Sequence, residues 1–514
     1  MKYGKYLLFL VLLLPAFVMR DYTPDNELRY LSIADEALRD HSFFAFHNHG
    51  LAYADKPPLY LWLVMLGKAL FGVHSMLYLS LLSLIPAMVI LITMDKWLEN
   101  STDKKNRATL QLMLLSTGYF IGSAVVLRMD IMMTMFIVLA MRTFYKMYTG
   151  EGGKYDSVLF PVYVFMALFT KGPVGILLPL LSVLVFLLIQ RKIKTFGKYW
   201  GWKTWGILLL GCAAWFSAVY WEGGKEYLNN LLFNQTVNRA IDAFHHKRPF
   251  YYYFVSIWYI LAPWSLFYIG LTIAAVRRKA ISTDLERLLL TVAVVTLLML
   301  SSFSSKVDVY MLPSIPFFSA LAILLFQKRD NTKLSQWLLA IPVGVVTLAA
   351  PVAVVLSFTP KMQMLQNVFI YIALAILFSS GVMSLLHLLR HRNTNRAINS
   401  FSFGLLLTVF VGSFALPLLN NRIGYGEMCK TGLEMAREAK VNEFYLYNIR
   451  RGENVDVYLQ KEAHILEDKD IQNGINGKGV LFFRQRDVEK NEQLRQITAG
   501  KTVRNTGEYS VVVL

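Results

Sequence analysis

The sequence predicts a polytopic α-helical membrane protein that ends in a small α/β domain. Of its 514 residues, 55% are hydrophobic and only 17% are charged, whereas soluble domains carry about 25% charged residues. Apolar runs such as Trp205–Trp221 and Leu288–Phe303 approach the roughly 20 residues that cross a bilayer core. After Asn420 the apolar runs give way to short alternating strand and helix patterns.

We expect about thirteen spans from the apolar runs. They lie near Leu7–Val18, Met76–Met94, Leu110–Val126, Ile131–Tyr145, Val158–Phe169, Val174–Ile189, Trp205–Trp221, Tyr253–Val276, Leu288–Phe303, Tyr310–Phe326, Trp337–Phe358, Val368–Leu389 and Phe401–Leu419. The first run has a basic N-terminal end and an apolar core, as a cleaved signal peptide has. It lacks a small-x-small cleavage site, which favours an uncleaved first span. The apolar stretch Leu59–Gly72 is short for a span and predicts a helix lying in the membrane interface.

Basic residues fill alternate loops, as the positive-inside rule requires of cytoplasmic loops. Examples are Lys104, Lys105 and Arg107, and later Arg277, Arg278 and Lys279. The net charge of +18 therefore indicates membrane orientation, and nucleic acid is not an expected partner. An odd number of spans places the C-terminus outside. Residues 1–419 then form a helical domain with outer-face loops 20–75 and 222–252, and residues 420–514 form an outer α/β domain.

Within the α/β domain, four segments have strand patterns: Val441–Ile449, Val455–Gln460, Gly479–Gln485 and Tyr509–Leu514. Gly426–Lys440 and Arg486–Gly500 have the periodicity of amphipathic helices. The sequence contains two cysteines, so no disulfide framework is predicted.

The first outer loop carries carboxylates beside apolar spans, in the motif Pro24–Tyr30. A charge at a helix centre costs about 2.5–3.5 kcal/mol, so such residues indicate a solvated loop or a site. Asp25 and Glu27 are candidates for a general base, which needs a carboxylate near an acceptor proton. The structural alternative is helix capping, with Arg29 as the ion-pair partner of Asp25. Tyr30 completes the motif.

Several further polar residues are predicted on the same outer face. Lys56 precedes two prolines, which disfavour helix at that residue; it either presents its amine to a ligand or snorkels to the interface. Lys171 in a turn between two spans and Asp130 at the start of a span allow the same two interpretations.

The second outer loop and a later turn carry cations beside aromatic residues, which suits an anionic lipid head group. We expect these cations, together with Lys56, to bind a phosphate that faces Asp25 or Glu27; they are Arg239, His246, Lys247, Arg248 and Lys306, with Tyr310 as a further candidate. The adjacent His245 and His246 leave a divalent metal as an alternative. Successive side chains rarely chelate one ion, however, and no matching ligand spacing is present, so no metal site and no cofactor are predicted.

Five segments occur in an order that resembles integral-membrane glycosyltransferases of the GT-C type. They are PDNELRY at 24–30, KPPLYLW at 56–62, LFTKGPVGILLP at 168–179, HHKRPFYYY at 245–253 and FSSKVDVYMLPSIP at 303–316. The resemblance is in particular to bacterial aminoarabinose transferases that modify lipid A, which are relatives of protein O-mannosyltransferases. It implies an undecaprenyl-phosphate-linked sugar donor, a lipid A acceptor, inversion at the anomeric carbon, and an active site on the periplasmic face of the inner membrane.

The family motif opens with an Asp-Glu pair, and in strict register Asn26 replaces that Asp. We therefore assign the catalytic role to Asp25 by a one-residue shift, with Glu27 as the alternative. Lys56 matches the first-loop lysine of the family. His246 and Lys247 match its basic pair, although a lysine offers a point charge rather than a bidentate fork.

Two other functions remain open from the sequence. One is transfer of a sugar to Ser or Thr of a protein acceptor, as in O-mannosyltransferases. The other is transport of a lipid-linked sugar, although transporters often show internal repeats and mid-membrane broken helices, and no repeat is visible here.

Overall fold

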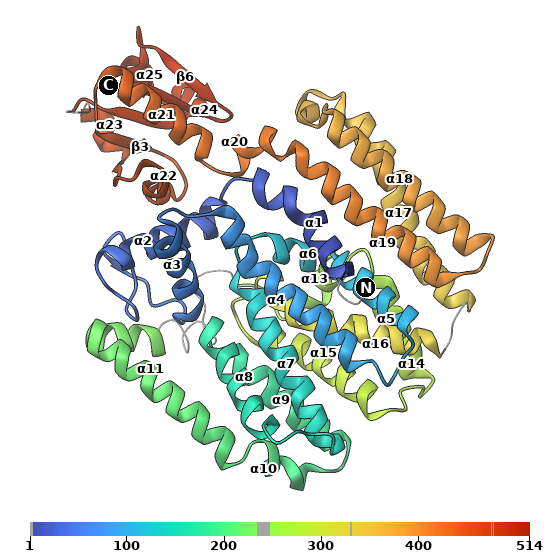
Figure 1. Ribbon diagram of the computed structural model, residues 1–514. Coiled ribbons are helices and arrows are strands. Elements are labelled where there is room, and N and C mark those ends of the chain that lie inside the picture. Colours follow the sequence, from blue (N-terminus) through green and yellow to red (C-terminus); the bar gives the residue numbers. More distant parts are fainter. Residues whose placement is uncertain (1–3, 234–246, 329–331, 474, 476) are drawn as a thin grey trace.

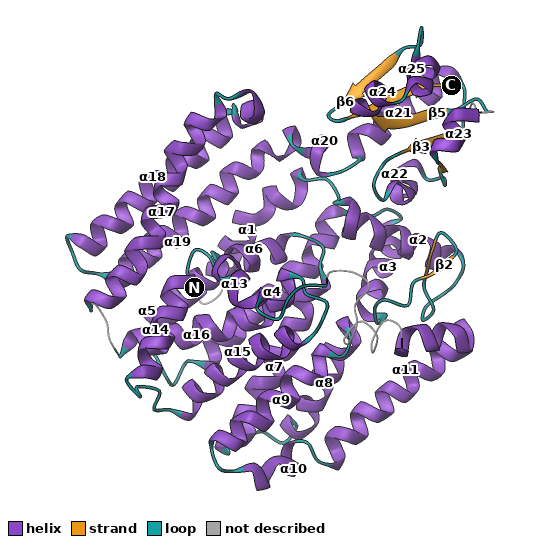
Figure 2. Cartoon of the chain, turned by 180° about the vertical axis from the view of Figure 1, so that it is seen from behind, coloured by secondary structure: helices purple, strands orange, loops and turns teal. Residues whose placement is uncertain are grey.

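Long apolar helices make up most of the chain in the computed structural model, which describes residues 4–233, 247–328, 332–473, 475 and 477–514. The strands are confined to the C-terminal domain and to one short hairpin in the first outer loop (Figures 1 and 2). The helices lie roughly side by side, and the C-terminal domain sits at one end of the array, next to α1 and α2 (Figure 1).

The helices of the first half begin and end as follows: α1 Gly4–Met19, η1 Pro24–Leu28, α2 Arg29–Arg39, α3 Leu59–Phe71, α4 Met76–Trp97, α5 Lys104–Leu115, α6 Gly118–Val125, α7 Met129–Thr149, α8 Asp156–Lys171, α9 Val174–Ile189, η2 Ile193–Thr195, α10 Phe196–Tyr199 and α11 Trp202–Asn229. The hairpin strands are β1 His47–Asn48 and β2 Leu51–Ala52. The second half contains α13 Tyr252–Ile260, α14 Ser265–Arg277, α15 Asp284–Ser302, η4 Asp308–Ser314, α16 Ile315–Gln327, α17 Lys333–Ser357, η5 Pro360–Leu365, α18 Val368–Leu389, α19 Thr394–Gly412, η6 Ser413–Leu418 and α20 Asn420–Ile423.

The multi-pass membrane character is confirmed, whereas the predicted number of spans is not. Within the described ranges, seven helices are long and apolar enough to cross a membrane, or up to ten if each bent pair is one span. The expected count of about thirteen is therefore not reproduced. One reason is length: the predicted spans near 158–169 and 174–189 are helices of 16 residues each, somewhat short for a bilayer core.

Three pairs of consecutive helices meet at a sharp bend instead of continuing as one straight helix. The bends are 81° between α1 and the η1–α2 segment, 69° between α5 and α6, and 119° between α13 and α14. At the second bend, Ser116 and Thr117 donate hydrogen bonds back to the carbonyls of Leu112 and Met113, at 2.7 and 2.9 Å, a pattern that bends helices. At the third bend stands Pro263, which lacks the N–H that a helix needs.

The position of each helix in the array follows from its burial. In the 18-residue apolar window of Asp308–Gln327, 94% of the residues are buried inside the protein, whereas the corresponding shares in the strongly apolar α17 and α18 are 22% and 17%. An apolar helix with such exposure fits a lipid-facing position. In Figure 1, α17, α18 and α19 form an outer layer on one side, and α11 lies at the opposite side.

The C-terminal domain has the predicted α/β character. Its five-stranded sheet has the order β4-β3-β5-β7-β6, built from β3 Phe444–Tyr447, β4 His464–Leu466, β5 Val480–Arg484, β6 Val503–Thr506 and β7 Tyr509–Val513. The pairs β3–β4 and β3–β5 are parallel, and β5–β7 and β6–β7 are antiparallel. The helices are α21 Gly426–Ala439, α22 Asp456–Leu459, α23 Asp468–Asn473, α24 Gln485–Lys490 and α25 Glu492–Thr498, with η7 at Gly452–Val455.

One predicted strand of this domain is wrong. The segment 455–460 forms helical turns, which the Gln460 N–H closes by donating to the Asp456 carbonyl at 2.8 Å. The Asp456 carboxylate accepts from the Val457 N–H and from the Ser32 hydroxyl of α2, both at 2.9 Å. The edge strands β4 and β6 were not predicted, since three or four partly exposed residues give little periodicity.

The C-terminal domain is docked firmly on the helical domain. Asp21, just after α1, accepts hydrogen bonds from the Gly426 N–H at 2.7 Å and from the Tyr458 hydroxyl. Asn420 accepts from the Asp21 N–H and donates to the Met19 carbonyl, both at 2.9 Å. A Cβ at Gly424 would lie 2.3 Å from the Asp21 carboxylate, so this close approach requires glycine.

Candidate active site

Asp25 lies in a tight π-type turn between α1 and α2. The turn η1 closes with a hydrogen bond from the Leu28 N–H to the Thr23 carbonyl at 3.1 Å, and single π turns occur frequently at functional sites. Pro24 fills the first position, where its missing N–H is not needed. The Asp25 side chain is 46% exposed and therefore accessible to a ligand.

Glu27, two residues further on, is buried and bonded to other protein groups instead. Its side chain is fully buried and forms a two-pronged pair with Arg20, with both contacts at 2.7 Å. Its oxygens also accept hydrogen bonds from the backbone N–H groups of Thr23 and Leu127, both at 2.8 Å. A carboxylate occupied in this way cannot reach an acceptor proton, so the proposed catalytic alternative at Glu27 does not fit the geometry.

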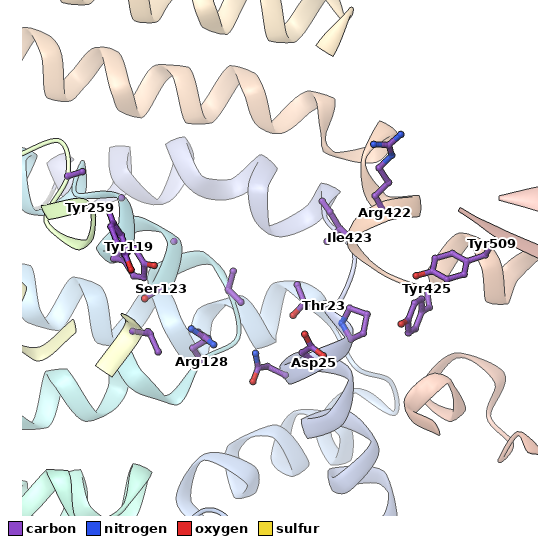
Figure 3. Close-up of a pocket in the computed structure, with 17 residues that line it drawn as sticks. Thr23, Asp25, Tyr119, Ser123, Arg128, Tyr259, Arg422, Ile423, Tyr425 and Tyr509 are labelled. Carbon is purple, nitrogen blue, oxygen red and sulfur yellow. The ribbon is translucent and has the colours of Figure 1, made fainter. Parts of the chain in front are cut away.

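A cavity of about 760 Å³ opens beside Asp25; we call it the junction cavity because both domains line it (Figure 3). The helical domain contributes Thr23, Pro24, Asp25, Asn26, Gly118, Tyr119, Gly122, Ser123, Val126, Arg128, Tyr259, Ala262 and Val309. The segment after α19 and the α/β domain contribute Arg422, Ile423, Tyr425 and Tyr509. All three helix bends border this cavity, and the Gly118 N–H donates to the Ala262 carbonyl at 2.9 Å where two of them meet.

A carboxylate surrounded by tyrosines lies against one wall of the junction cavity. Asp308 accepts hydrogen bonds from Tyr252 and Tyr259 at 2.7 Å and from Tyr119 at 3.2 Å. Because Tyr119 and Tyr259 also line the cavity, these bonds hold two aromatic rings in place at its wall.

A second cavity, of about 440 Å³, lies between α7, α8, α9, α11 and α15. It is lined mainly by apolar side chains, which include Leu168, Val174, Leu177, Trp215, Phe216, Leu231, Leu300 and Phe303. Its charged lining residues are Asp55, Lys56 and Lys171, and Tyr310 also lines it. We call it the apolar cavity. The structure thus brings three predicted site residues together here: Lys56, Lys171 and Tyr310.

Two further groups of charged residues belong to this region of the protein. The Arg29 guanidinium, which lines neither cavity, lies 5.5 Å from the centre of the Tyr53 ring, and Asp55 and Asp25 are among the charges that act on it. Asp130 is buried and paired with Lys171, whose amine lies 4.2 Å from the centre of the Tyr310 ring. Asp25 and Lys56 line different cavities, and the expectation of one phosphate cluster that faces Asp25 stays a prediction.

One predicted phosphate ligand, Lys306, and one further site candidate, Tyr30, have other surroundings. Lys306 is only 4% exposed, and its amine donates to the backbone carbonyls of Arg248 and Phe303. Burial lowers the pKa of Lys306. Its amine is thus engaged by backbone carbonyls, and Lys306 does not line either cavity. Tyr30 is buried and packs edge-on against Tyr60, with ring centres 6.1 Å apart, so it belongs to the core.

The end of the second outer loop borders the apolar cavity. Lys247 forms a β-bridge with Ser305, and the Arg248 N–H donates to the Ser304 carbonyl at 3.3 Å. Ser305 itself lines the apolar cavity. The predicted ligands Arg239 and His246 lie outside the described residues, as does His245 of the alternative metal site. Among the residues that are described, no three His, Cys, Asp or Glu side chains converge in a way that would hold a metal ion.

Several residues at the cavities were missed from the sequence. Asp55 stands directly before Lys56, and this adjacent charge was the available signal. Arg128 stands two residues before Asp130, and that proximity was its signal. Arg450 of the α/β domain forms an ion pair with Asp25 at 3.0 Å, and no sequence pattern marked it because the contact depends on how the domains dock.

Comparison with known proteins agrees with this architecture. Residues 55–221 match a family described as dolichyl-phosphate-mannose-protein mannosyltransferase. An undecaprenyl phosphate-α-4-amino-4-deoxy-L-arabinose arabinosyl transferase of Edwardsiella ictaluri is 27% identical over 62% of this chain and 57% of its own length. An uncharacterized protein of Aquifex aeolicus is 26% identical over 60% of this chain and 62% of its own. The matches thus span about three fifths of these relatives.

The solved structures extend the likeness in fold to the whole chain. Together with the sequence matches, they confirm the resemblance to GT-C integral-membrane glycosyltransferases and the predicted helical fold with a C-terminal α/β domain. The particular fold is that of ArnT from Cupriavidus metallidurans. The crystal structure of ArnT bound to undecaprenyl phosphate aligns with a TM-score of 0.79 over 100% of this chain and 98% of ArnT, at 17% identity. The apo structure aligns with a TM-score of 0.76.

Proposed function

We propose that this protein is a glycosyltransferase that moves a sugar from an undecaprenyl-phosphate donor to a phosphate group of lipid A. The observation that carries the proposal is the pair of cavities, one with lysines among apolar walls and one with an exposed carboxylate. The apolar cavity has the chemistry of a lipid-phosphate site, and the junction cavity has an accessible carboxylate and room for a polar head group. The arabinosyl transferase names of the sequence relatives and the ligand of the ArnT structure support the same donor class.

The donor fits the apolar cavity by composition. A polyprenyl chain needs apolar walls, which the leucines and aromatic residues supply. Its phosphate needs cations, and Lys56 and Lys171 stand at the same cavity. Lys247 and Arg248 approach from the second outer loop through their pairing with Ser304 and Ser305, and Arg239 and His246 remain candidates for the same role.

The reaction would be a direct displacement. An acceptor oxygen in the junction cavity attacks the anomeric carbon, a new C–O bond forms, and the bond from that carbon to the donor phosphate breaks with inversion. The leaving phosphate takes the electron pair, and the neighbouring cations stabilise its charge. Asp25 takes the acceptor proton or orients the acceptor oxygen. Both substrates then meet between the two cavities, and in the predicted topology this point lies on the periplasmic face of the inner membrane.

Transfer to a protein hydroxyl is the second candidate, and the match of residues 55–221 to the mannosyltransferase family favours it. The purified protein in proteoliposomes, given an undecaprenyl-phosphate-linked aminoarabinose donor, separates these functions. We expect glycosylated lipid A by mass spectrometry. Glycosylated Ser or Thr in added periplasmic protein would establish the alternative instead. Translocation of intact donor with no glycosylated product would establish a transporter and contradict both.

A further inference from the structure

The α/β domain forms part of the wall that encloses Asp25. Buried apolar residues of α2 and α3, such as Leu31 and Leu61, belong to one continuous cluster with Met428, Leu446 and Val511 of the α/β domain. Together with the contacts of Asp21, this packing fixes Tyr425 and Tyr509 against the junction cavity, with ring centres 5.5 Å apart. The domain is thus positioned to act on whatever the cavity binds.

Arg450 is the residue of this domain that contacts Asp25. One guanidinium nitrogen lies 3.0 Å from an Asp25 oxygen, and the Tyr425 hydroxyl donates to the Arg450 carbonyl, which fixes the backbone of Arg450. The Arg450 side chain is 72% exposed. Exposed ion pairs contribute about 0–1 kcal/mol to stability, so the apolar cluster and the Asp21 contacts, rather than this pair, explain how the domain stays docked.

The charge of Asp25 matters for the acceptor. The charged side chains among the described lining residues of the junction cavity are Asp25, Arg128 and Arg422. The Arg422 guanidinium also donates to the Met364 sulfur at 2.9 Å. An anionic head group that approaches Asp25 is repelled by its carboxylate, because like charges at contact distance oppose each other even in a solvated site. Arg450 supplies a compensating positive charge at that carboxylate.

We propose that Arg450 is a specificity-determining residue, which neutralises Asp25 so that the junction cavity accepts an anionic acceptor rather than a neutral one. This inference rests on the proposed function, in which the acceptor is a lipid A phosphate. According to this inference, the α/β domain selects the acceptor by its charge.

The test measures equilibrium binding of fluorescent lipid A to the full-length protein in detergent, without donor. We expect Arg450→Ala to weaken binding of lipid A by about fivefold, the factor that corresponds to about 1 kcal/mol, and to leave binding of a dephosphorylated lipid A analogue unchanged. Arg450→Lys should retain most of the affinity. The matched control is Arg504→Ala, which removes an exposed arginine paired with Glu438 at 2.7 Å in the same domain.

The decisive variant is the double substitution. If Arg450 acts by neutralising Asp25, adding Asp25→Asn to Arg450→Ala restores lipid A binding, because the repulsive charge is gone. Equal lipid A binding by wild type and Arg450→Ala overturns the inference, and so does an absence of restoration in the double variant or of any lipid A binding by wild type. Transfer is assayed on the same samples. Lipid A binding with the expected pattern but no transfer by wild type would contradict the proposed function and leave the role of Arg450 intact.

Discussion

Arg20 and Glu27 form a buried, two-pronged ion pair that fixes the loop in which Asp25 stands. Arg20 also donates to the Val125 carbonyl at 3.2 Å, and Glu27 accepts from the Leu127 N–H at 2.8 Å. The pair therefore ties the start of the first outer loop to the connection between α6 and α7. Asp25, two residues before Glu27, is held at the cavity by this neighbour.

Glu27→Gln should destabilise the protein. Removal of one partner from a buried pair leaves an uncompensated charge and costs about 3–5 kcal/mol. We expect a clear drop in the thermal midpoint of the detergent-solubilised protein. Size-exclusion chromatography with fluorescence detection measures this midpoint. An unchanged midpoint together with lost activity would return Glu27 to the list of candidate bases.

Asp25→Asn should abolish most transfer without affecting stability. Loss of a general base lowers rates by about 10²–10⁴-fold, and a half-exposed carboxylate contributes little to packing. Single-turnover transfer at matched expression measures the effect. The control is Asp40→Asn, which changes an exposed carboxylate paired with Arg39 at 2.8 Å on α2. Wild-type turnover by Asp25→Asn would show that Asp25 is not the base.

Lys56→Ala should weaken use of the donor. A hydrogen bond to a charged group contributes about 1.5–3 kcal/mol, so we expect transfer at limiting donor to fall by about tenfold or more and to recover in part at saturating donor. Lys225→Ala, on the exposed surface of α11, serves as the control. Normal transfer at limiting donor would leave Lys56 as an interfacial anchor.

The docking of the α/β domain should depend on pH through Asp21. Burial raises the pKa of Asp21, and hydrogen bonds from Tyr458, Gly426 and Tyr22 offset part of that rise. Because the folded-state pKa lies above the unfolded value, the stabilising contribution of Asp21 is fully present below the unfolded pKa of about 3.9 and is lost as the pH rises through the folded pKa.

We therefore expect the thermal midpoint to fall as the pH rises from about 4 through the folded-state pKa of Asp21. Burial also raises the pKa of Asp456, which acts in the same direction. The comparison that isolates Asp21 is the difference in midpoint between wild type and Asp21→Asn across this range. Parallel pH profiles for the two proteins would contradict the assignment.

The predicted orientation places the C-terminus in the periplasm. Alkaline phosphatase fused after Leu514 should be active, and the same fusion after Lys198 should be inactive, because the enzyme folds only outside the cytoplasm. The reverse pattern would place both cavities on the cytoplasmic face and exclude lipid A as the acceptor at that face.

The sequence was informative where chemistry depends on local pattern. The apolar runs predicted the helices, and the motifs at Asp25, Lys56 and Lys171 marked residues that line the two cavities. It was uninformative where the outcome depends on packing. The burial of Glu27 depends on residues far away in the sequence. So does one of the hydrogen bonds from the Lys306 amine to backbone carbonyls, the bond to Arg248. The bend at Ser116–Thr117 lies within an apolar run that is equally compatible with a straight helix, whereas Pro263 is a sequence signal for the third bend.

Three helix bends meet at the junction cavity, and they determine its shape independently of the side chains that determine its chemistry. The outline of the cavity is set by where main chains turn, and its charge is set by a few side chains such as Asp25, Arg128 and Arg422. Unpaired main-chain groups at such turns also need water or protein partners, which favours a hydrated recess. A lineage that keeps the turns is then free to exchange side chains and adopt new acceptors while its architecture stays the same.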